Sequence, residues 1–334
     1  MEDKILFTVV MAAYNAEPTI GLALESIRSQ EFEQKQIEVL VVDGGSVDKT
    51  REIAAEYGAV VLDNPYKLPE PAKTIGFQAA RGQYVCIMDS DEVICKKTSF
   101  RERYGFMQKH PEVKCYRIGL KTPVGSPVCC YYINEVGDPF TCFVYRTFKG
   151  GMEDLIREKA VSREDGFVGR FRKEDIKPIG DSCTVFDREY VCKYYGNELE
   201  ETTTSTVFEK IIEDTGYVGY IEGDFHWHYS KSSLKVFFKK LKFRVVNNIY
   251  NVEGSGYAQK ANTNQKLNMR KYLYPFYCAS IFFPIFDGCR MAVNYRHPVF
   301  LLHPIFAWYV LVEIMIQLLK KMMGKKTTVE SYGE

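Results

Sequence analysis

Two carboxylates separated by one residue follow an apolar segment in the first third of the chain. Residues 84–88 are apolar and predict a buried strand, and Asp89-Ser90-Asp91-Glu92 follows directly. In an extended segment, residues two apart point to the same side, so Asp89 and Asp91 can approach one ion. Mg²⁺ and Mn²⁺ prefer carboxylate oxygens and keep positions free for phosphate oxygens. The same letters suit a solvated turn or the N-cap of a helix, so the motif alone leaves both interpretations open.

The elements predicted around this motif would place it at the edge of a sheet. Short apolar runs at 6–12, 37–42, 59–62 and 84–88 alternate with helical patterns at 19–30, about 46–57 and about 72–80. This alternation is typical of an α/β fold with a Rossmann-like, mostly parallel sheet flanked by helices. Ligands of such sheets bind outside the carboxyl ends of the strands. Three of these ends carry polar loops, namely Tyr14-Asn15, Asp43-Gly44-Gly45-Ser46 and Asp89-Ser90-Asp91.

Two common nucleotide-binding patterns are absent after the first predicted strand. Neither G-x-G-x-x-G nor the P-loop pattern is present there, which disfavours dehydrogenases and phosphate-loop enzymes. Between residues 93 and 181 the sequence pattern does not predict the order of helices and strands. A helix is predicted at 207–213 and a strand at 217–221, which leads into Gly223-Asp224-Phe225-His226-Trp227-His228.

The composition sets only broad limits. The chain has 334 residues, a formal net charge of +1 and ten cysteines, so it can hold one large domain or two ordinary ones. The near-zero charge gives no reason to expect nucleic acid as a partner. The cysteines show no repeated C-x-x-C pair, which argues against a zinc knuckle or a disulfide framework and favours a reducing cytosol. No signal peptide is visible, so we expect the first domain on the cytoplasmic side.

An ordered series of motifs resembles the inverting family 2 glycosyltransferases of the GT-A fold, which use nucleotide-diphospho-sugars. The resemblance covers roughly the first hundred residues well and 180–228 loosely. Its motifs are Val9-Val10-Met11-Ala12-Ala13-Tyr14-Asn15, Leu24-Glu25-Ser26-Ile27, Val41-Val42-Asp43-Gly44-Gly45-Ser46-Val47-Asp48 and Ala79-Ala80-Arg81-Gly82, followed by the acidic motif. The resemblance implies a Mg²⁺ or Mn²⁺ ion held chiefly by Asp91.

The resemblance also implies a nucleotide site. Its residues would be Ala13, Tyr14, Glu17, Asp43, Lys73, Asp89 and Ser90. Asp43 would accept a hydrogen bond from the base, although it also suits a turn before two glycines. Asp89 would serve the ribose or lie beside the metal ligands. Lys73 stands where the family often has Arg, and it would offer phosphate a point charge without the bidentate fork of Arg. A solvated helix residue is the alternative for Lys73.

Two histidines extend the predicted metal site. His226 and His228 share a face if their segment is extended. The family places a His near the diphosphate and often on the metal, and the spacing from Gly216-Tyr217 favours His228. A His that binds a metal must be neutral, so activity would fall as it protonates. A structural role is the alternative for both.

The general base is the main departure from the family. Inverting transfer needs a carboxylate that takes the proton from the acceptor hydroxyl. Family members carry Glu-Asp some dozen residues before the position that matches Gly216. At that distance before Gly216 this chain has Thr and Ser instead. We therefore predict Glu200 or Glu201 as the base, with Glu153-Asp154 as an alternative and a solvated acidic run as the structural interpretation. The Gln-x-x-Arg-Trp motif of processive synthases is absent, which favours transfer of a single sugar.

Two apolar stretches, 272–286 and 298–319, lie near the end of the chain. The second has the length of a bilayer span but includes His303, Pro304 and Glu313, and the first is shorter and broken by prolines. Basic residues among phenylalanines at 235–244 suit an anionic lipid surface, or a basic helix packed on the domain. Lysines after the second stretch would keep the C-terminus cytosolic. We predict membrane association, either by a hairpin or by helices lying in the interface.

Together these inferences predict a GT-A catalytic domain at 1–230 and a helical, membrane-associated region at 231–334. The predicted function is metal-dependent inverting transfer of one sugar from a nucleotide-diphospho-sugar to a hydroxyl or phosphate acceptor. The tail favours a lipid-linked, polyprenyl-type acceptor at the cytoplasmic face of a membrane. A soluble glycan acceptor and a catalytically inactive nucleotide-binding protein are the alternatives. A sugar nucleotidyltransferase is disfavoured, because its Gly-rich basic loop is missing after the first strand.

Overall fold

The chain divides into two compact units, each built from two segments. The computed structural model describes residues 4–146, 152–175, 183–196, 204–230, 233–250, 268–325 and 327. The first unit is formed by Met1–Pro123 with Met152–Tyr229, and the second by Val124–Gly151 with Ser230–Glu334. The second unit thus includes an early segment, 124–151, that the sequence-based division at residue 230 left in the first domain.

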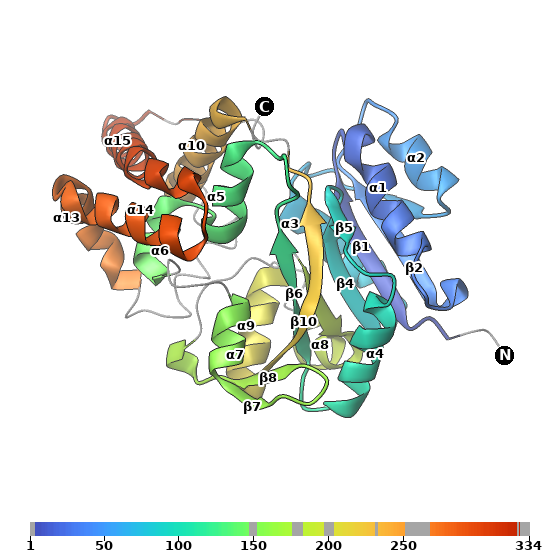
Figure 1. Cartoon of the computed structure of the whole chain (residues 1–334). Coiled ribbons are helices and arrows are strands. Elements are labelled where there is room, and N and C mark those ends of the chain that lie inside the picture. The colour runs from blue at the N-terminus through green and yellow to red at the C-terminus, as the bar shows by residue number, and fades with distance from the viewer. Residues whose placement is uncertain are drawn as a thin grey trace. The chain divides into compact units, whose positions relative to one another are not determined.

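A mixed sheet forms the centre of the first unit (Figure 1). Its strand order is β3-β2-β1-β4-β9-β6-β10-β8-β7, and β5 pairs with β10. Strands β3, β2, β1 and β4 are parallel neighbours, whereas β9 runs antiparallel between β4 and β6. The strands are β1 (Phe7–Ala13), β2 (Ile37–Asp43), β3 (Val60–Asp63), β4 (Tyr84–Asp89), β5 (Glu92–Ile94), β6 (Cys115–Lys121), β7 (Ala160–Ser162), β8 (Phe167–Arg170), β9 (Thr184–Asp187) and β10 (Tyr217–His228).

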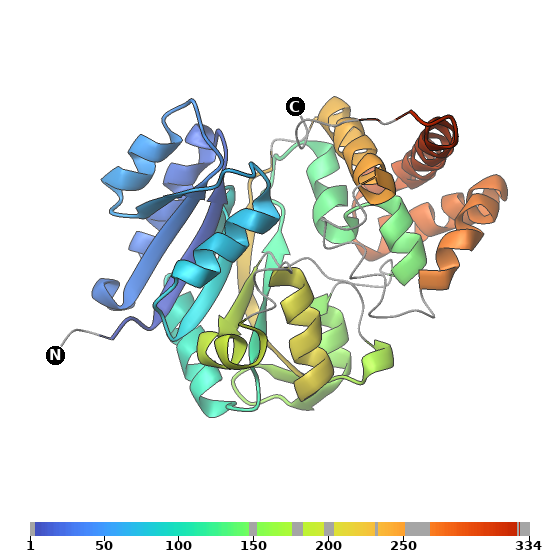
Figure 2. The same ribbon diagram turned by 180° about the vertical axis from the view of Figure 1, so that it is seen from behind.

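Alternating side chains of the central strands build two cores, one on each face of the sheet. Val9 and Met11 of β1 belong to one core, and Val10 between them belongs to the other. Helices α1 (Glu17–Arg28), α2 (Thr50–Glu56) and α4 (Ser99–Lys109) cover the first face. Helices α3 (Pro69–Ala79), α7 (Met152–Glu158), α8 (Arg188–Tyr195) and α9 (Thr204–Thr215) cover the second (Figure 2). Burial on both faces explains why these strands read as continuous apolar runs.

Helix α3 lies unusually close to the sheet because it has a glycine at the contact. A Cβ atom added at Gly76 would lie 2.2 Å from Cγ1 of Val10 and 3.1 Å from Cγ2 of Val42. Carbon atoms repel one another strongly at such distances. Gly76 therefore fixes the depth at which α3 packs, and with it the position of the neighbouring Lys73.

The predicted α/β fold is confirmed, and the parallel half of the sheet follows the sequence prediction closely. The predicted strands 6–12, 37–42 and 84–88 correspond to β1, β2 and β4, each within about one residue at its ends. The antiparallel strands β7 and β8 lie within the stretch 93–181 that the pattern did not order, and β9 follows it directly without having been predicted. They carry few residues each, so alternation in the sequence has little length in which to appear.

The second unit is helical. Its elements are α5 (Val128–Val136), α6 (Pro139–Tyr145), α10 (Leu234–Tyr250), α13 (Tyr274–Ala279), α14 (Phe282–Asn294) and α15 (His303–Met322), with 3₁₀ turns η4 (Met269–Leu273) and η5 (Pro298–Leu302). Large buried side chains such as Tyr132, Phe237 and Phe306 form one core among them. The early helices α5 and α6 supply part of this core, which explains why 124–151 belongs to this unit.

A buried chain of polar groups crosses this helical core. The Tyr277 hydroxyl lies 3.1 Å from Oδ2 of Asp287 and 2.9 Å from Nε2 of His303, and the Tyr132 hydroxyl lies 2.6 Å from Nδ1 of His303. A hydroxyl has one proton, so when Tyr277 donates to Asp287 its oxygen accepts from Nε2 of His303. Burial lowers the pKa of His303 to about 3. The imidazole is therefore neutral, and the chain links helices α5, α13, α14 and the start of α15.

One helix in the described residues, Pro298–Met322, is long and apolar enough to cross a membrane by length and composition, and the bent pair Met269–Ala279 and Phe282–Asn294 passes the same test when joined. The bend between these two helices is 98°.

Candidate active site

Three of the predicted site residues meet at the carboxyl edge of the parallel strands. Ala13 at the end of β1 pairs in register with Asp43 at the end of β2. The preceding residue, Ala12, pairs with Asp89 at the end of β4. In open α/β sheets this edge is where ligands bind. The structure therefore brings Ala13, Asp43 and Asp89 to one place, as the sequence predicted.

The Asp43 carboxylate organises the loop that follows β2. Its Oδ2 accepts hydrogen bonds from the backbone N–H groups of Gly45 and Ser46, both at 3.0 Å, and from Arg51 at 3.0 Å. Its Oδ1 accepts from the Ser46 hydroxyl at 2.5 Å. Burial would raise the pKa of Asp43, but these hydrogen bonds outweigh it and hold the pKa below the usual value. Asp43 is thus an ionised residue at the turn before the two glycines, of which Gly45 has a φ of +87°.

The loop after β1 is attached to the loop after β2. Asn15 lies in the left-handed region at φ 47°, and its backbone N–H donates to the Ser46 hydroxyl at 2.8 Å. Glu17 begins α1, and its Oε2 accepts from the backbone N–H of Lys49 at 3.2 Å. Tyr14 is exposed between them, with 42% of its surface accessible. These contacts hold Tyr14 and Glu17 beside the Asp43 loop.

Lys73 is buried and faces the acidic motif. Its ammonium group lies 3.2 Å from Oδ1 of Asp89, and only 7% of its side chain is accessible. This position excludes the solvated helix residue that the sequence left open as an alternative. A buried Lys beside a carboxylate provides a fixed positive charge at the edge of the sheet.

Asp91 and His228 form the second pair at this edge. Strand β5 runs antiparallel to β10, with Glu92 opposite His228, and the backbone N–H of Tyr229 donates to the carbonyl of Asp91 at 2.7 Å. As a result, Nε2 of His228 lies 3.2 Å from Oδ2 of Asp91. Burial would lower the pKa of His228, but the carboxylates of Asp91, Glu92 and Asp89 raise it to about 9. The strong negative potential at this edge suits a cation.

His226 has different partners from His228. Its Nδ1 lies 3.0 Å from Oε2 of Glu92, and its Nε2 lies 3.0 Å from Nη2 of Arg103. A guanidinium group only donates hydrogen bonds, so Nε2 must accept and the imidazole proton sits on Nδ1. Burial, with the nearby Arg103, holds the pKa of His226 below its usual value despite Glu92. His226 is therefore a neutral residue of the interior, although the sequence grouped it with His228.

The buried polar network continues from His226 through Arg103 to Asp224. Arg103 donates from Nε and Nη2 to the two carboxylate oxygens of Asp224, at 2.8 and 2.9 Å, and the Tyr116 hydroxyl donates to Oδ2 of Asp224 at 2.7 Å. Arg103 and Asp224 are fully buried. Such a pair needs every charge to be matched, because an unmatched charge is costly in the interior. The network fixes the part of β10 that leads to His228, since Asp224 and His226 lie on the same strand.

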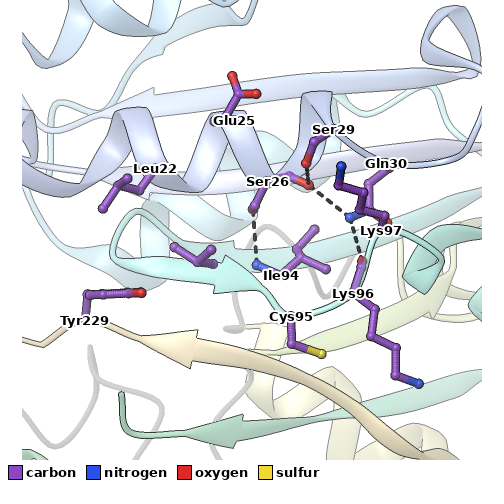
Figure 3. Close-up of a pocket in the computed structure, with 11 residues that line it drawn as sticks. Leu22, Glu25, Ser26, Ser29, Gln30, Ile94, Cys95, Lys96, Lys97 and Tyr229 are labelled. Atoms are coloured by element: carbon purple, nitrogen blue, oxygen red, sulfur yellow. Dashed lines mark hydrogen bonds between the residues drawn. The ribbon is translucent and has the colours of Figure 1, made fainter. Parts of the chain in front are cut away.

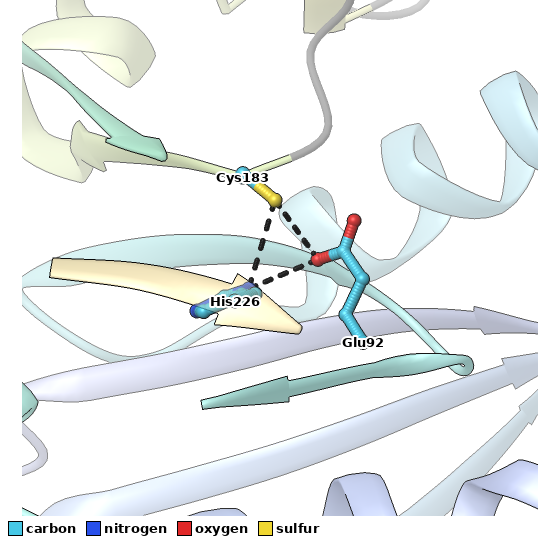
Figure 4. Close-up of side chains that lie close together, drawn as sticks. All are labelled: Glu92, Cys183 and His226. Atoms are coloured by element: carbon cyan, nitrogen blue, oxygen red, sulfur yellow. Dashed lines mark hydrogen bonds and ion pairs between the residues drawn. The ribbon is translucent and has the colours of Figure 1, made fainter. Parts of the chain in front are cut away.

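Glu92, Cys183 and His226 form a cluster of metal-ligand types within the described residues, with ligand atoms within 4.8 Å of one another (Figure 4). The Cys183 thiol lies 3.1 Å from Oε2 of Glu92, the same oxygen that faces His226. Burial and the neighbouring Glu92 raise the pKa of Cys183 well above its usual value, so the thiol keeps its proton. Two donors thus already satisfy this oxygen. Asp91 and His228, half-buried at the sheet edge, fit a divalent cation better than this cluster.

The predicted general bases differ in how they are placed. Glu200 and Glu201 lie outside the described residues. Glu153, on α7, has Oε1 3.3 Å from Nε of Arg117, and Asp154 pairs with Arg157 at 2.7 Å. Ser90, predicted to serve the nucleotide, is half-buried between Asp89 and Asp91.

A pocket of about 320 Å³ lies on the other side of β5, between this strand and α1 (Figure 3). Leu22, Ser26, Ile94 and Tyr229 contribute to its wall. Ser26 accepts from the backbone N–H of Ile94 at 3.1 Å. None of the predicted nucleotide or metal residues lines it, so we do not assign it to the site.

Several residues of the site were not predicted from the sequence. Arg103, Asp224, Glu92 and Cys183 come from segments far apart in the chain; for example, 121 residues separate Arg103 from Asp224. Spacing cannot reveal a pair of this kind. A polar residue in an apolar pattern is the one available signal, and Arg103 on the helical stretch 99–109 has it.

Comparison with known proteins decides the family of the first segment. Residues 8–125 match the family described as Glycosyl transferase family 2. These residues are a family 2 glycosyltransferase domain. Similar curated proteins are the poly(ribitol-phosphate) beta-N-acetylglucosaminyltransferase TarS of Staphylococcus aureus, 30% identical over 31% of this chain and 19% of TarS, and the succinoglycan biosynthesis protein ExoO of Rhizobium meliloti, 37% identical over 26% of each chain.

Solved glycosyltransferase structures share the fold over nearly the whole chain. Mannosyltransferase PcManGT from Pyrobaculum calidifontis, solved with GDP-Man and Mn²⁺, covers 92% of this chain and 86% of its own, with a TM-score of 0.57 and 15% identity. The structure of TarS residues 1–349 with UDP covers 98% of this chain and 95% of its own, with a TM-score of 0.51 and 14% identity. The sequence matches to TarS and ExoO, in contrast, span only 19% and 26% of those proteins.

Proposed function

We propose that this protein is a metal-dependent inverting glycosyltransferase that transfers one sugar from a nucleotide-diphospho-sugar to an acceptor hydroxyl or phosphate. The observation that carries the proposal is the pair Asp91 and His228, 3.2 Å apart at the carboxyl edge of the sheet, where Asp91 follows β4, two strands from Asp43 at the end of β2. The family 2 match over 8–125, which includes Asp43 and Asp91 but not His228, supports it, as do neighbours solved with UDP or with GDP-Man and Mn²⁺.

Asp91 and His228 would hold the divalent cation. When bound, this ion supplies positive charge to the diphosphate that leaves the sugar. His228 would bind as the neutral imidazole, so its proton must leave when the ion binds. His226 and Glu92 would act as positioning residues, because their hydrogen bond fixes β10 against β5 below the metal ligands.

The nucleotide would lie between the loops after β1 and β2. Ala13, Tyr14 and Glu17 would border the base, and Asp43 would accept from it through a second lone pair of Oδ1, beside the one that the Ser46 hydroxyl uses. Lys73 would attract the phosphates with its buried ammonium group. Asp89 and Ser90 would contact the ribose or the ion's surroundings. The acceptor would be lipid-linked at the cytoplasmic face of a membrane, because the second unit exposes a large apolar surface.

Glu200 or Glu201 would take the proton from the acceptor, with Glu153 and Asp154 as the alternatives. Glu153 is the weaker alternative because its carboxylate faces Arg117. Replacing Glu200 and Glu201 singly by Gln should abolish transfer in one case while nucleotide binding stays intact. Full activity in both variants would reject this assignment.

Release of nucleoside diphosphate tests the proposal directly. The protein would be incubated with Mn²⁺, a panel of UDP- and GDP-sugars, and membrane lipid extract or soluble oligosaccharides. We expect release with one donor, which ceases with EDTA and in His228→Gln. The matched control is Glu56→Gln, which removes an exposed carboxylate from α2 and should leave release unchanged. Nucleotide binding without release under any combination would favour an inactive nucleotide-binding protein instead.

A further inference from the structure

The second unit exposes apolar side chains along the outward face of α14. Pro284, Gly288 and Met291 are buried and mark the inward face. The opposite face carries Phe282, Phe286, Cys289 and Val293, at helical spacings of four, three and four, and all four are exposed. Phe282 has 80% of its surface accessible and Phe286 has 63%. A helix that packs on a water-soluble domain has polar residues on such a face.

Helix α15 shows the same inversion more strongly. Its exposed residues before the last turn are apolar, namely Ile305, Val312, Met315, Ile316, Leu318 and Leu319, and the last turn exposes Met322 beside Lys321. Its polar residues Glu313 and Gln317 are buried instead, where Gln317 donates to Oε1 of Glu313 at 2.6 Å. The helix thus turns its hydrogen-bonding side chains inward and its hydrocarbon side chains outward. This pattern indicates that the outer face meets a medium that is itself apolar.

The charges around this face have one sign. Between 268 and 325 the acidic residues are Asp287 and Glu313, against seven Lys and Arg. Asp287 is half-buried and accepts from Tyr277, and Glu313 is buried. Exposed lysines flank these apolar side chains, at Lys321 in the last turn of α15, at Lys325 after it, and at Lys235, Lys239 and Lys242 on α10, which packs along α15. An anionic partner fits these charges, whereas a second copy of the same face would repel it.

We infer that the outward faces of α14 and α15, named here the apolar face (Phe282, Phe286, Val293, Ile305, Val312, Leu319), dock onto an anionic lipid monolayer and lie within one leaflet. The inference rests on the proposed function only in taking a membrane as the partner. Apolar side chains would enter the acyl region while the lysines contact the headgroups.

The packing of α15 argues against a transmembrane span. Tyr250 of α10 donates to the carbonyl of Gln317, and Lys242 approaches Glu313 at 3.9 Å, so α10 follows α15 along its length. If α15 crossed the bilayer, the exposed lysines of α10 would enter the hydrocarbon region, which is costly. In addition, 44% of the most apolar 18-residue stretch between Pro298 and Met322 is buried within the protein. The 98° bend before Phe282 gives α13 and α14 the shape of a wedge rather than of a straight span.

Vesicle flotation of the full-length chain tests this inference without donor or acceptor. Vesicles would contain phosphatidylcholine alone or mixed with phosphatidylglycerol. For Phe282→Ser/Phe286→Ser we expect partitioning to fall roughly a hundredfold, since each Phe loses most of its buried apolar area. For Lys235→Gln/Lys239→Gln/Lys242→Gln we expect a fall on the order of tenfold or more on anionic vesicles only. The matched control, Leu22→Ser/Val161→Ser, removes two exposed apolar side chains from the first unit and should bind as the wild type.

Three outcomes would overturn the inference. Variants that float like the wild type would remove the apolar face from membrane binding. Wild-type protein that stays in membranes after carbonate extraction would indicate a span. A dimer that Phe282→Ser/Phe286→Ser dissociates, with no vesicle binding, would identify a second copy as the occupant. Far-ultraviolet circular dichroism of each variant shows that it is folded, and diphosphate release measured in detergent reports separately on the proposed function.

Discussion

Each unit contains a buried histidine, and the two histidines differ in what surrounds them. His226 in the first unit lies among full charges, with Glu92 on one nitrogen and the Arg103–Asp224 pair on the other. His303 in the second unit lies between two tyrosine hydroxyls. The charged network supports the sheet edge where we propose that a cation and phosphates bind, whereas the hydroxyl-centred chain supports helices whose outer surface is apolar. A buried Arg–Asp pair therefore lies beneath the proposed site, whereas hydroxyl groups hold the buried histidine of the second unit.

The largest expected effect is on activity, and it separates the residues that bind from those that support them. Asp91→Asn should lower diphosphate release on the order of a thousandfold, because the metal loses a charged ligand. The urea midpoint should change little, since Asp91 is half-exposed. Kinetics and urea unfolding of the same preparation check both parts. A large loss of stability would mean that Asp91 belongs to the structural network instead.

The next effect is on the stability of the first unit. Arg103→Met leaves the Asp224 carboxylate buried without its ion pair, which should cost about 3–5 kcal/mol. The chain has two tryptophans, Trp227 in the first unit and Trp308 in the second, so Trp308→Phe leaves a fluorescence reporter of the first unit. The double variant Arg103→Met/Asp224→Leu should recover part of the loss. A cost below about 1 kcal/mol for the single variant would contradict the importance of the charged network.

A pH dependence distinguishes the hydroxyl-centred chain. The pKa of His303 is lowered to about 3 from its ordinary 6.5, so below pH 6.5 the unfolded chain binds a proton that the folded chain does not. Stability of the second unit should therefore fall as the pH drops from 6.5 toward 3, at a slope approaching about 1.4 kcal/mol per pH unit. Urea unfolding of Trp227→Phe, with Trp308 as reporter, measures the slope. His303→Gln should flatten it, and an unchanged slope in that variant would assign the dependence to other groups.

The smallest effect is expected at a single neutral hydroxyl. Tyr277→Phe removes hydrogen bonds to Asp287 and His303 and should cost about 1–2 kcal/mol. Fluorescence of Trp308 in Trp227→Phe again follows the second unit. Tyr272→Phe, at an exposed position of η4, is the matched control and should cost close to nothing. A cost for Tyr277→Phe as large as that for Arg103→Met would remove the difference between the two networks.

The sequence predicted those features that depend on local apolar patterns or on the ordered series of family motifs. Strands β1, β2 and β4 were predictable because apolar runs of six or seven residues end in polar loops, and their parallel pairing brought Ala13, Asp43 and Asp89 together. Asp91 and His228, separated by 137 residues, were also proposed together, on the strength of the family resemblance. Their 3.2 Å contact places the two side chains side by side, and their role in metal binding stays a prediction.

Other features depend on pairing that no local pattern records. His226 resembles His228 in the sequence, yet the first is fully buried and the second is 16% exposed in its side chain. The difference arises from Arg103, which reaches β10 from α4. The inverted faces of α14 and α15 were likewise hidden, because both helices are apolar nearly all round and their composition alone does not tell inside from outside.

The split composition of the second unit affects how the chain is made. Helices α5 and α6 are synthesised roughly ninety residues before α10 and more than that before α15. At a synthesis rate of about 5–20 residues per second, several seconds pass before the helices that they pack against are made. During this interval Tyr132, Phe143 and Tyr145, all buried in the finished unit, have no core to enter. A fragment that ends at residue 230 would keep them in that state permanently. Removing 124–151 together with the residues after 230 should therefore give a more soluble first unit than truncation at 230 alone.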